Sequence, residues 1–539
     1  MKMKSGRSGF YRALVVGCGI ALGGCNEDGS SGASEGPENT APIPQHQLGN
    51  AASGREVFRF ETFGNERFWT DALKLQQGIA AAGVTPLQAL ALGLHVDSDA
   101  VPPAVAAQLV AELRADPTGR SSPLLNNPAT TVTLVNLNAV IGIAAKDSNG
   151  DGTINILGGD KTGATCALCH TITDNSVFNM PNGGSIGKRQ DGRAPHTLNF
   201  GTLISLGQNT RAYYPALQLA LAANGGNTLG RAPVGLTERS TEAEVDAYAS
   251  NPAFYPVGMF DDTIDGNGDP MHNMPLFEQD LAFPYGSEGA IAKLDNFSNL
   301  VYTALLDPTT VVTPGGRAFL NKLGGPAGDE IANDYAVVLA ATGVAGPFPF
   351  VRAAPPATAS LAGTEEFPLG IRVDSAKLAD MNAYLFGLEP PTATGDSTRG
   401  RQAFQGAGCT NCHNVDQSRP VPGFIVAMRT IFPGDNPVVL LPARMPPLNP
   451  IIDTPGNTFD DKMAVVNASL RGLERGTALP LLLDLARKPV FLHDDSVRSL
   501  ERLLDPARGA TAPHPFYLGD PGDRGAVVEF LRSLDKSPN

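Results

Sequence analysis

Apolar residues in this chain recur mainly at the three- and four-residue spacing that gives an α-helix one buried face. The windows with this spacing are 72–82, 104–113, 316–323, 329–341, 378–388 and 525–534. From about residue 171 to residue 290 the periodicity is weak, and Gly, Pro and Asn are frequent. A loop-rich stretch of this size is usually wrapped over another part of a fold. The pattern therefore predicts a mainly α protein with long loop insertions and an extra helical region near its N-terminus.

The first 24 residues have the layout of an export signal. Basic residues precede a short apolar run, 13–22, which is followed by Leu22-Gly23-Gly24-Cys25. This run is shorter than the about 20 residues that span a bilayer, and the ending resembles that of a bacterial lipoprotein signal peptide, 1–24, with Cys25 as the lipidated residue. A plain signal peptide with an incidental Cys25 is the alternative. Both predict a protein of the periplasm or cell surface, and the polar segment 25–52 is expected to be a flexible tether.

The charge of the chain limits its partners. The 539 residues carry a formal net charge of −14 and are 42% hydrophobic, which is typical of a soluble globular protein. An acidic surface argues against binding to nucleic acid and against a basic membrane-surface patch. The membrane is therefore expected to be reached only through the lipid anchor at Cys25.

Every cysteine after Cys25 belongs to one of two motifs with the same spacing. Four of the six cysteines form Cys166-Ala167-Leu168-Cys169-His170 and Cys409-Thr410-Asn411-Cys412-His413. C-x-x-C-H is the spacing that attaches a c-type haem, because two thiols one helical turn apart can add to the two vinyl groups of the porphyrin. The following histidine can then ligate the iron. The motifs predict two covalent haem c groups, with His170 and His413 as proximal ligands. A redox dithiol or a zinc site is the alternative, although zinc ligand pairs usually lie much closer in sequence.

Two similar helix ends divide the chain. The segments 378–388 and 525–534 align with Tyr384 opposite Phe530 and Leu385 opposite Leu531. Each segment resembles the terminal helix of a cytochrome c domain, in which an aromatic residue packs against the helix that leads into the haem motif. The segment 400–404 is expected to be that leading helix for the second motif. We therefore predict an N-terminal helical region plus a first cytochrome c-like domain in 53–390, and a second cytochrome c-like domain in 391–539.

Further segments resemble the superfamily of di-haem cytochrome c peroxidases and MauG-like proteins, which includes the secreted di-haem rubber oxygenases. Arg193-Ala194-Pro195-His196-Thr197-Leu198-Asn199 is similar to its R-N-x-P-T-L-x-N segment, and 469–472 with 488–500 is similar to its T-L-R-N and P-Y-F-H-D-G-S segments. Ala507 stands where the peroxidases carry an axial methionine. The resemblance implies an oxidoreductase in which one haem reduces peroxide or activates O2 and the other transfers electrons. An electron donor or acceptor protein and a small oxidant are then the expected partners.

The sixth ligand of each iron decides between an enzyme and an electron carrier. For the second haem the candidates are Met445, His493 and His514, with Met445 and His493 preferred. For the first haem the candidates are Met180, His196, His272 and Met274, or an open position. If that position is open, the candidates for polarising the O–O bond are Arg193, His272 and Glu278. A pure electron-transfer cytochrome with both irons six-coordinate is the alternative function.

One loop resembles the beginning of a calcium-binding loop. Asp147, Asn149 and Asp151 place oxygen atoms at alternate positions before Gly152. The twelfth position, which usually carries a bidentate Glu, is Gly158, so Asp160 would have to supply the last carboxylate. The alternative is a turn stabilised by its own Asp and Asn side chains.

Overall fold

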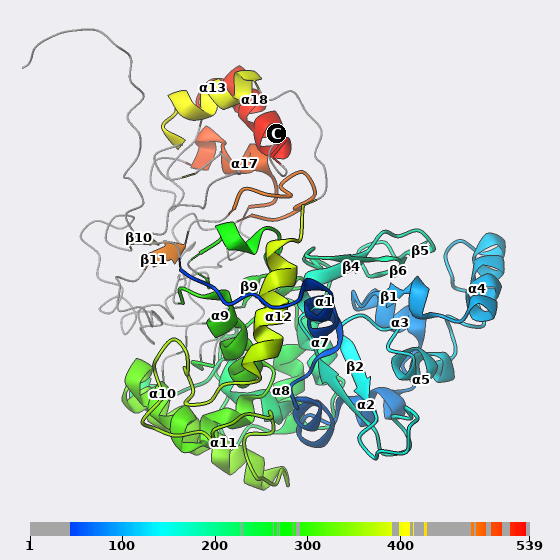
Figure 1. Cartoon of the computed structure of the whole chain (residues 1–539), viewed down its shortest axis with the longest axis vertical. Helices are drawn as coiled ribbons and strands as arrows, with labels where there is room; N and C mark the ends of the chain where they lie inside the picture. The colour runs from blue at the N-terminus through cyan, green and yellow to red at the C-terminus, as the bar shows by residue number, and fades with distance from the viewer. Residues whose placement is uncertain are drawn as a thin grey trace, which may run out of the picture.

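The structure is a computed structural model (Figure 1). It describes residues 44–226, 228, 230–261, 264–266, 268, 270–283, 285–286, 291–390, 398–409, 413, 425–427, 476–478, 481–491, 497–508 and 518–534. Within these ranges the protein is mainly α, as predicted, and its strands are only two to four residues long. The expected signal peptide, Cys25 and most of the tether lie outside the described residues.

The N-terminal part contains five helices. Asn50 caps the first by accepting a hydrogen bond from the Ser53 backbone N–H, and Thr85 and Gln88 form a reciprocal capping box on the third. The helices are α1 (Ala51–Phe60), α2 (Leu75–Ala82), α3 (Pro86–Ala91), α4 (Pro103–Ala115) and α5 (Pro128–Asn136). The predicted segment 72–82 is interrupted, because a π-helical turn ends at Ala72 and Lys74 adopts a left-handed conformation before α2.

Short strand pairs lie on both sides of the first motif, and most of them fall in the loop-rich segment that follows it. The antiparallel pairs are β2 (Ile143–Lys146) with β3 (Lys161–Ala164), β4 (Thr171–Thr173) with β7 (Arg189–Asp191), β5 (Phe178–Asn179) with β6 (Ser185–Gly187), and β8 (Met259–Phe260) with β9 (Met271–His272). β6 also pairs in parallel with β1 (Val96–Asp97). Two helices, α7 (Phe200–Ser205) and α8 (Glu242–Ala249), follow within the same segment.

The later helices confirm the periodic windows of the sequence. They are α9 (Leu294–Leu300), α10 (Pro314–Gly324), α11 (Pro326–Ala341), α12 (Ser375–Phe386), α13 (Thr398–Gly406), α17 (Leu500–Leu503) and α18 (Pro521–Arg532). The strands β10 (Ile425–Ala427) and β11 (Gly476–Ala478) pair antiparallel. Figure 1 shows α13, α17 and α18 grouped at one end of the molecule, beyond the end of α12. None of the helices in the described ranges is long and apolar enough to cross a membrane.

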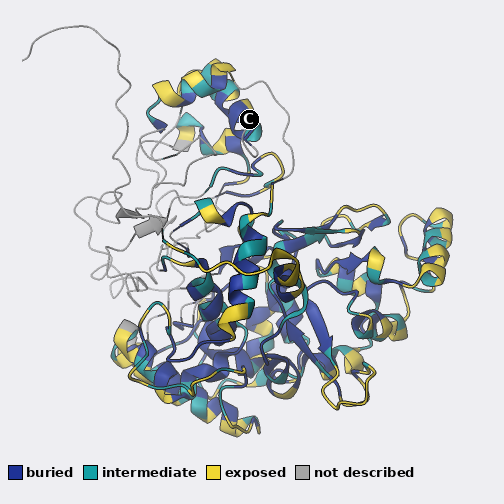
Figure 2. Cartoon of the chain, viewed as in Figure 1, coloured by how far each residue is buried: buried dark blue, intermediate teal, exposed yellow. Residues whose placement is uncertain are grey.

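Three hydrophobic clusters hold these elements together. The largest contains Trp69 and spans the π-helical turn, α2–α5, α7, α8 and α11. The second lies between α1, α9 and α12, and the third joins α13, α17 and α18. Figure 2 shows buried residues gathered in the middle of the described chain and exposed residues along its edge, for example on α4. The first C-x-x-C-H motif lies at the boundary of the two larger clusters, because Cys169 packs against the first and Cys166 against the second.

Candidate functional site

The first motif forms a single helical turn. The helix α6 (Ala167–His170) follows Cys166, and the His170 backbone N–H donates to the Cys166 carbonyl oxygen at 3.1 Å. This turn brings the two thiols and the imidazole into one short segment. Gly142 lies directly against it: its φ is +83°, and a Cβ at this position would be 2.1 Å from Cα of Leu168. A glycine is therefore required where the strand β2 passes the motif.

The two thiols of the first motif are partly buried. Cys166 and Cys169 form no disulfide, and Sγ of Cys166 lies 3.2 Å from Oη of Tyr302. Burial raises the pKa of the Cys166 thiol to about 11 and that of the Cys169 thiol to about 12. Both thiols are therefore protonated at neutral pH, and neither has the lowered pKa of a redox-active cysteine. This argues against the redox dithiol alternative.

His170 is held in one orientation by a backbone carbonyl. Its Nδ1 lies 3.0 Å from the carbonyl oxygen of Met274. Burial lowers the pKa of His170 to about 4, so the ring is neutral, and only a protonated Nδ1 can donate to that carbonyl. The lone pair is then on Nε2, which is the tautomer of a metal-ligating histidine whose second nitrogen is bound to a fixed acceptor. The residues of the first motif therefore fit a c-type haem.

A buried carboxylate, Asp191, forms hydrogen bonds with three elements around the motif. Asp191 accepts hydrogen bonds from Oγ1 of Thr171 at 2.9 Å, from Nε of Arg59 at 2.6 Å and from Oη of Tyr384 at 2.6 Å. These partners come from β4, α1 and α12 respectively. Because Thr171 directly follows His170, this network fixes the strand that leaves the motif to the helix pair α1–α12.

The structure places several predicted residues of the first site near the motif. The segment 271–278 contains His272, Met274 and Glu278. Met274 contributes its carbonyl oxygen to His170 while its side chain is 40% exposed. His272 is buried in β9, with its ring centroid 6.4 Å from that of His196. Glu278 is buried at the start of a 3-10 turn, where its backbone N–H donates to the carbonyl oxygen of Leu388.

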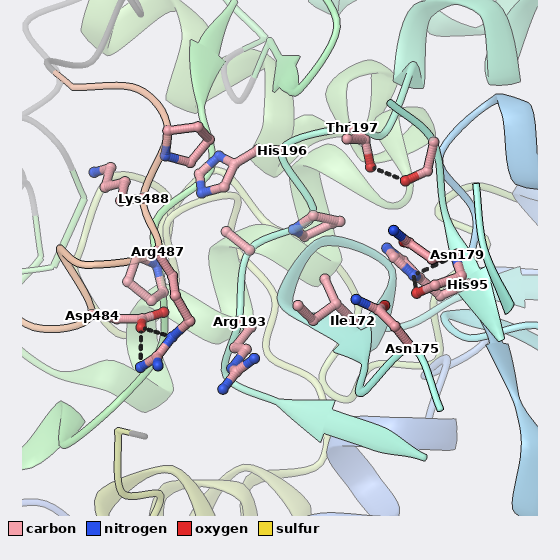
Figure 3. A pocket seen from close by; sticks show the side chains of 16 residues that line it. His95, Ile172, Asn175, Asn179, Arg193, His196, Thr197, Asp484, Arg487 and Lys488 are labelled. Atoms are coloured by element: carbon pink, nitrogen blue, oxygen red, sulfur yellow. Dashed lines mark hydrogen bonds and ion pairs between the residues drawn. The ribbon is translucent and has the colours of Figure 1, made fainter. Parts of the chain in front are cut away.

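Arg193 lies beside the segment 481–491 (Figure 3) and follows Gly192, whose backbone N–H donates to the His170 carbonyl oxygen at 2.8 Å. Its guanidinium is half-buried, and burial lowers its pKa, as does the neighbouring Arg487, while Asp484 opposes this shift. Met180 is half-buried beside the largest hydrophobic cluster. The predicted role of Arg193 in polarising a bound oxidant stays a prediction.

The second motif follows α13. The His413 backbone N–H donates to the Cys409 carbonyl oxygen at 3.0 Å, the same pairing of residues as His170 with Cys166 in the first motif. The ring of Phe404 lies 6.4 Å from that of His413 and packs edge-to-face on Phe530 at 5.4 Å. Cys412, Met445, His493 and His514 lie outside the described residues, so the distal ligand of this site stays a prediction.

Sequence reasoning missed one internal repeat that frames both motifs. The helix pair α1–α12 and the helix pair α13–α18 cross in the same way, with Gly54 against the Asp380 carbonyl and Gly400 against the Ala526 carbonyl. Four residues further along each helix an aromatic pair meets: Phe58 with Tyr384 at 5.7 Å, and Phe404 with Phe530 at 5.4 Å. The signal was present in the sequence as Gly54-Arg55-Glu56-Val57-Phe58 and Gly400-Arg401-Gln402-Ala403-Phe404. The N-terminal helix α1 therefore forms a helix pair with α12.

The calcium-like loop is stabilised by hydrogen bonds of its own. Asp147 accepts from the backbone of Gly150 at 2.7 Å, Asn149 from the backbone of Asp151 at 2.9 Å, and Asp151 from Thr153. Asp160 accepts from Ser148 and Asn155. No group of three or more His, Cys, Asp or Glu side chains suited to a metal ion occurs among the residues that the structure describes. These contacts fit the turn interpretation, and a Ca²⁺ ion at Asp147, Asn149 and Asp151 stays a prediction.

Comparison with known proteins gave no relatives: no protein-family model, no curated protein and no solved structure matches this chain.

Proposed function

We propose that this chain is an exported di-haem c-type cytochrome of the peroxidase or oxygenase type. The observation that carries the proposal is the geometry of the first motif. Two thiols lie one helical turn apart, and the adjacent imidazole has its Nδ1–H bound to the Met274 carbonyl, which leaves Nε2 for a metal. A core histidine without such a role would not need two neighbouring cysteines at this spacing.

The residues around His170 would have three roles. Cys166 and Cys169 would attach the haem, His170 would ligate its iron, and the Met274 carbonyl together with the Asp191 network would fix the ring that does so. When bound, the iron supplies the redox chemistry, the reduction of peroxide or the activation of O2. We assign this site to the oxidant and the His413 site to electron transfer, following the resemblance of the sequence.

The repeated helix pair supports two cytochrome c-like domains, 53–390 and 391–539. In each domain a glycine-containing helix crosses a terminal helix, and an aromatic pair closes the crossing. In the second domain the crossing helix leads directly into Cys409. In the first domain the segment 61–165 is inserted between the crossing helix and Cys166, so the N-terminal helices would be an insertion within this domain.

The haem content of the mature protein tests the proposal. We expect the pyridine haemochrome spectrum to give two haems per chain, and the double variants Cys166→Ala/Cys169→Ala and Cys409→Ala/Cys412→Ala to give one each. The two variants serve as matched controls for each other. Colour that is extracted by acid acetone would contradict covalent attachment and sink the proposal.

Electron paramagnetic resonance separates the enzyme from the alternative. A high-spin ferric signal that changes on addition of cyanide or peroxide, and that disappears in the Cys166→Ala/Cys169→Ala variant, would support catalysis at the His170 site. Two low-spin signals that do not respond to either ligand would instead support the electron carrier with both irons six-coordinate.

A further inference from the structure

The residues that directly precede α1, 44–50, lie against α12 and are hydrogen-bonded to it. The Gly49 backbone N–H donates to the Ala379 carbonyl oxygen at 2.9 Å, and Nδ2 of Asn382 donates to the Gln47 carbonyl oxygen at 3.2 Å. Figure 1 shows this segment, in blue, passing α12 before it enters α1. Residues 44–50, which we call the N-terminal strap, are therefore the part of the predicted tether that contacts the folded protein.

Gly49 lets the strap come close to α12. A Cβ at this position would be 2.0 Å from Oδ1 of Asp380 and 2.8 Å from the Asp380 backbone nitrogen. The following residue binds the same carboxylate, because the Asn50 backbone N–H donates to Oδ1 of Asp380 at 2.6 Å. A larger residue at position 49 would therefore displace the strap, since there is no space for its side chain.

His46 holds the other end of the strap. Its ring packs edge-on against Phe386, the last residue of α12, with the two centroids 4.9 Å apart, and against Tyr285 at 6.0 Å. Its Nε2 accepts a hydrogen bond from the backbone N–H of Leu294, the first residue of α9, at 3.1 Å. The ring therefore joins the strap to α9, to α12 and to the segment around Tyr285.

The hydrogen bond between His46 and Leu294 requires a neutral imidazole. Nε2 can accept only while it carries a lone pair, and in the protonated ring both nitrogens are donors. Protonation would place two N–H groups opposite each other and leave the Leu294 N–H without its acceptor. Because Leu294 is buried, losing that acceptor is unfavourable. The protonation of His46 is therefore coupled to the docking of the strap.

The surroundings of His46 favour its neutral form. Burial lowers the pKa of His46, Asp295 and the Pro44 carbonyl oxygen raise it, and Lys293 lowers it, so that this pKa lies below its ordinary value of 6.5. The carboxylate of Asp295 is itself paired with Arg372, which compensates its charge.

The other two elements against the ring contribute no charge near neutral pH. The helix α12 presents the apolar ring of Phe386. Tyr285 presents an aromatic ring whose hydroxyl donates to the Gln279 carbonyl oxygen at 2.6 Å, and burial raises the pKa of this hydroxyl. Within the described residues, His46 is therefore the group at this contact that titrates in mildly acidic solution.

We propose that the N-terminal strap is a pH-dependent latch, which is docked on α12 while His46 is neutral and is released when Nε2 of His46 takes up a proton. The undocked segment binds this proton more readily than the docked one. The stability of the docked strap is therefore complete above about pH 6.5, the pKa of an exposed histidine, and is lost as the pH falls below it. The proposal does not depend on haem and goes beyond the proposed redox function.

Release would change how far the folded protein can lie from a membrane. An extended chain spans up to about 3.5 Å per residue, so residues 44–50 would add up to about 25 Å to the connection between Cys25 and α1. This consequence rests on the predicted lipid anchor at Cys25, whereas the release itself does not. Release would also uncover Tyr285 and Phe386, which pack in the second hydrophobic cluster.

Hydrogen–deuterium exchange of the mature protein, measured by mass spectrometry between pH 8 and pH 5, tests the proposal. The rates are corrected for the intrinsic pH dependence of exchange in an unfolded chain. We expect the amides of Gly49 and Asn50 to be protected at pH 8 and to lose this protection as the pH falls below about 6.5. The amides of α11, which packs in the largest hydrophobic cluster, should stay protected and so exclude global unfolding.

Two variants separate titration from docking. His46→Gln keeps an acceptor for the Leu294 N–H but does not titrate, so its strap should stay protected at pH 5. Gly49→Ala should release the strap at every pH, because its Cβ would overlap Asp380. Exchange of the His46 ring hydrogen reports the pKa of His46, which should return to about 6.5 in Gly49→Ala. Leu48→Ala is the matched control, since this side chain lies in the strap and is 56% exposed.

The pH at which protection is lost decides the outcome. The same pH dependence in His46→Gln as in the parent protein would assign the release to another group and overturn the proposal. A strap that is unprotected at pH 8, or a pKa of His46 that is the same in Gly49→Ala as in the parent, would overturn it as well. If circular dichroism shows that Gly49→Ala does not fold, the comparison of His46→Gln with Leu48→Ala still decides.

Discussion

Gly400 and Ala526 lie in direct backbone contact: a Cβ on Gly400 would be 2.0 Å from the carbonyl oxygen of Ala526. The same relationship joins Gly54 to Asp380 at 1.9 Å. Because no side chain fits between the two helices, each glycine sets how closely its pair can approach. The aromatic residue four positions later then packs into the crossing, which places the residues that follow it at a defined distance from the terminal helix.

This contact predicts a clear effect of adding one methyl group. Gly400→Ala should destabilise the second domain by about 1–3 kcal/mol, because the new Cβ must push the helix α18 away. Gly406→Ala in the same helix is the matched control, since nothing lies within 4 Å of that position. It should be neutral or stabilising by about 0.5–1 kcal/mol, because alanine favours a helix more than glycine does. Urea unfolding of both variants measures the difference. Equal destabilisation by the two substitutions would contradict the close crossing.

The helices of this fold could be predicted from local periodicity, but their pairing could not. The windows 104–113 and 329–341 match α4 and α11 because each has a continuous apolar face. The contact between α1 and α12 joins residues more than 300 positions apart, and no local pattern reports it. The repeat of Gly54 and Phe58 in Gly400 and Phe404 was the only signal, and the inserted segment 61–165 separates it from the first motif.

At the candidate site, side chains in a motif could be recognised from the sequence, but a backbone contact could not. Cys166, Cys169 and His170 could be singled out from the sequence by their spacing, and the structure places them in one helical turn. Haem attachment at these residues stays a prediction. The hydrogen-bond acceptor for His170 could not be predicted from the sequence, because it is a backbone carbonyl oxygen, and every residue has one. Met274 was a candidate ligand through its sulfur atom, which stays a prediction, and its carbonyl oxygen in addition lies 3.0 Å from Nδ1 of His170. The proximity of Arg193 to the segment 481–491 was missed because the two lie almost 300 residues apart in sequence.

Asp191 is expected to be important for stability, because it holds three separate elements. Asp191→Asn leaves the partly buried Arg59 without its counter-ion, so we expect a loss of about 3 kcal/mol in the free energy of unfolding. Tyr384→Phe removes one hydrogen bond of the same network and should cost about 1 kcal/mol. Glu56→Gln, in the exposed pair with Arg55, is the control and should change stability by less than about 0.5 kcal/mol. A value for Asp191→Asn as small as that of the control would show that the network contributes little.

His95 is expected to make stability depend on pH. Burial lowers its pKa to about 4 from an unfolded value of about 6.5. Because the unfolded chain binds the proton first as pH falls, the stability that neutral His95 provides is complete above pH 6.5 and is lost towards pH 4. The loss from this residue is expected to reach roughly 3 kcal/mol at pH 4. Urea unfolding at several pH values should show a shallower decline in His95→Gln than in the parent protein. Identical slopes would mean that His95 is not the group that titrates.

The thiols of the first motif give a direct test of the attachment site. If the chain is produced in the cytoplasm without its leader, where haem is not attached, Cys166 and Cys169 should remain as partly buried thiols. Their raised pKa values, about 11 and about 12, keep the reactive thiolate scarce at pH 8, so alkylation by iodoacetamide should be much slower than for an unfolded thiol with a pKa of about 8.5.

The reaction should accelerate as pH rises from about 8.5 towards 11. The folded state favours the protonated thiols, so the stability that they provide is present below pH 8.5 and is lost over the same interval. Mass spectrometry of the tryptic peptide containing both residues measures the reaction, and urea-unfolded chain gives the upper limit of the rate. In the exported protein the same peptide should carry the added mass of one haem and should not react with iodoacetamide even in urea, since both sulfur atoms are then thioethers. Alkylation of that peptide from the exported protein would show that the sulfur atoms are free and that no haem is attached at Cys166 and Cys169.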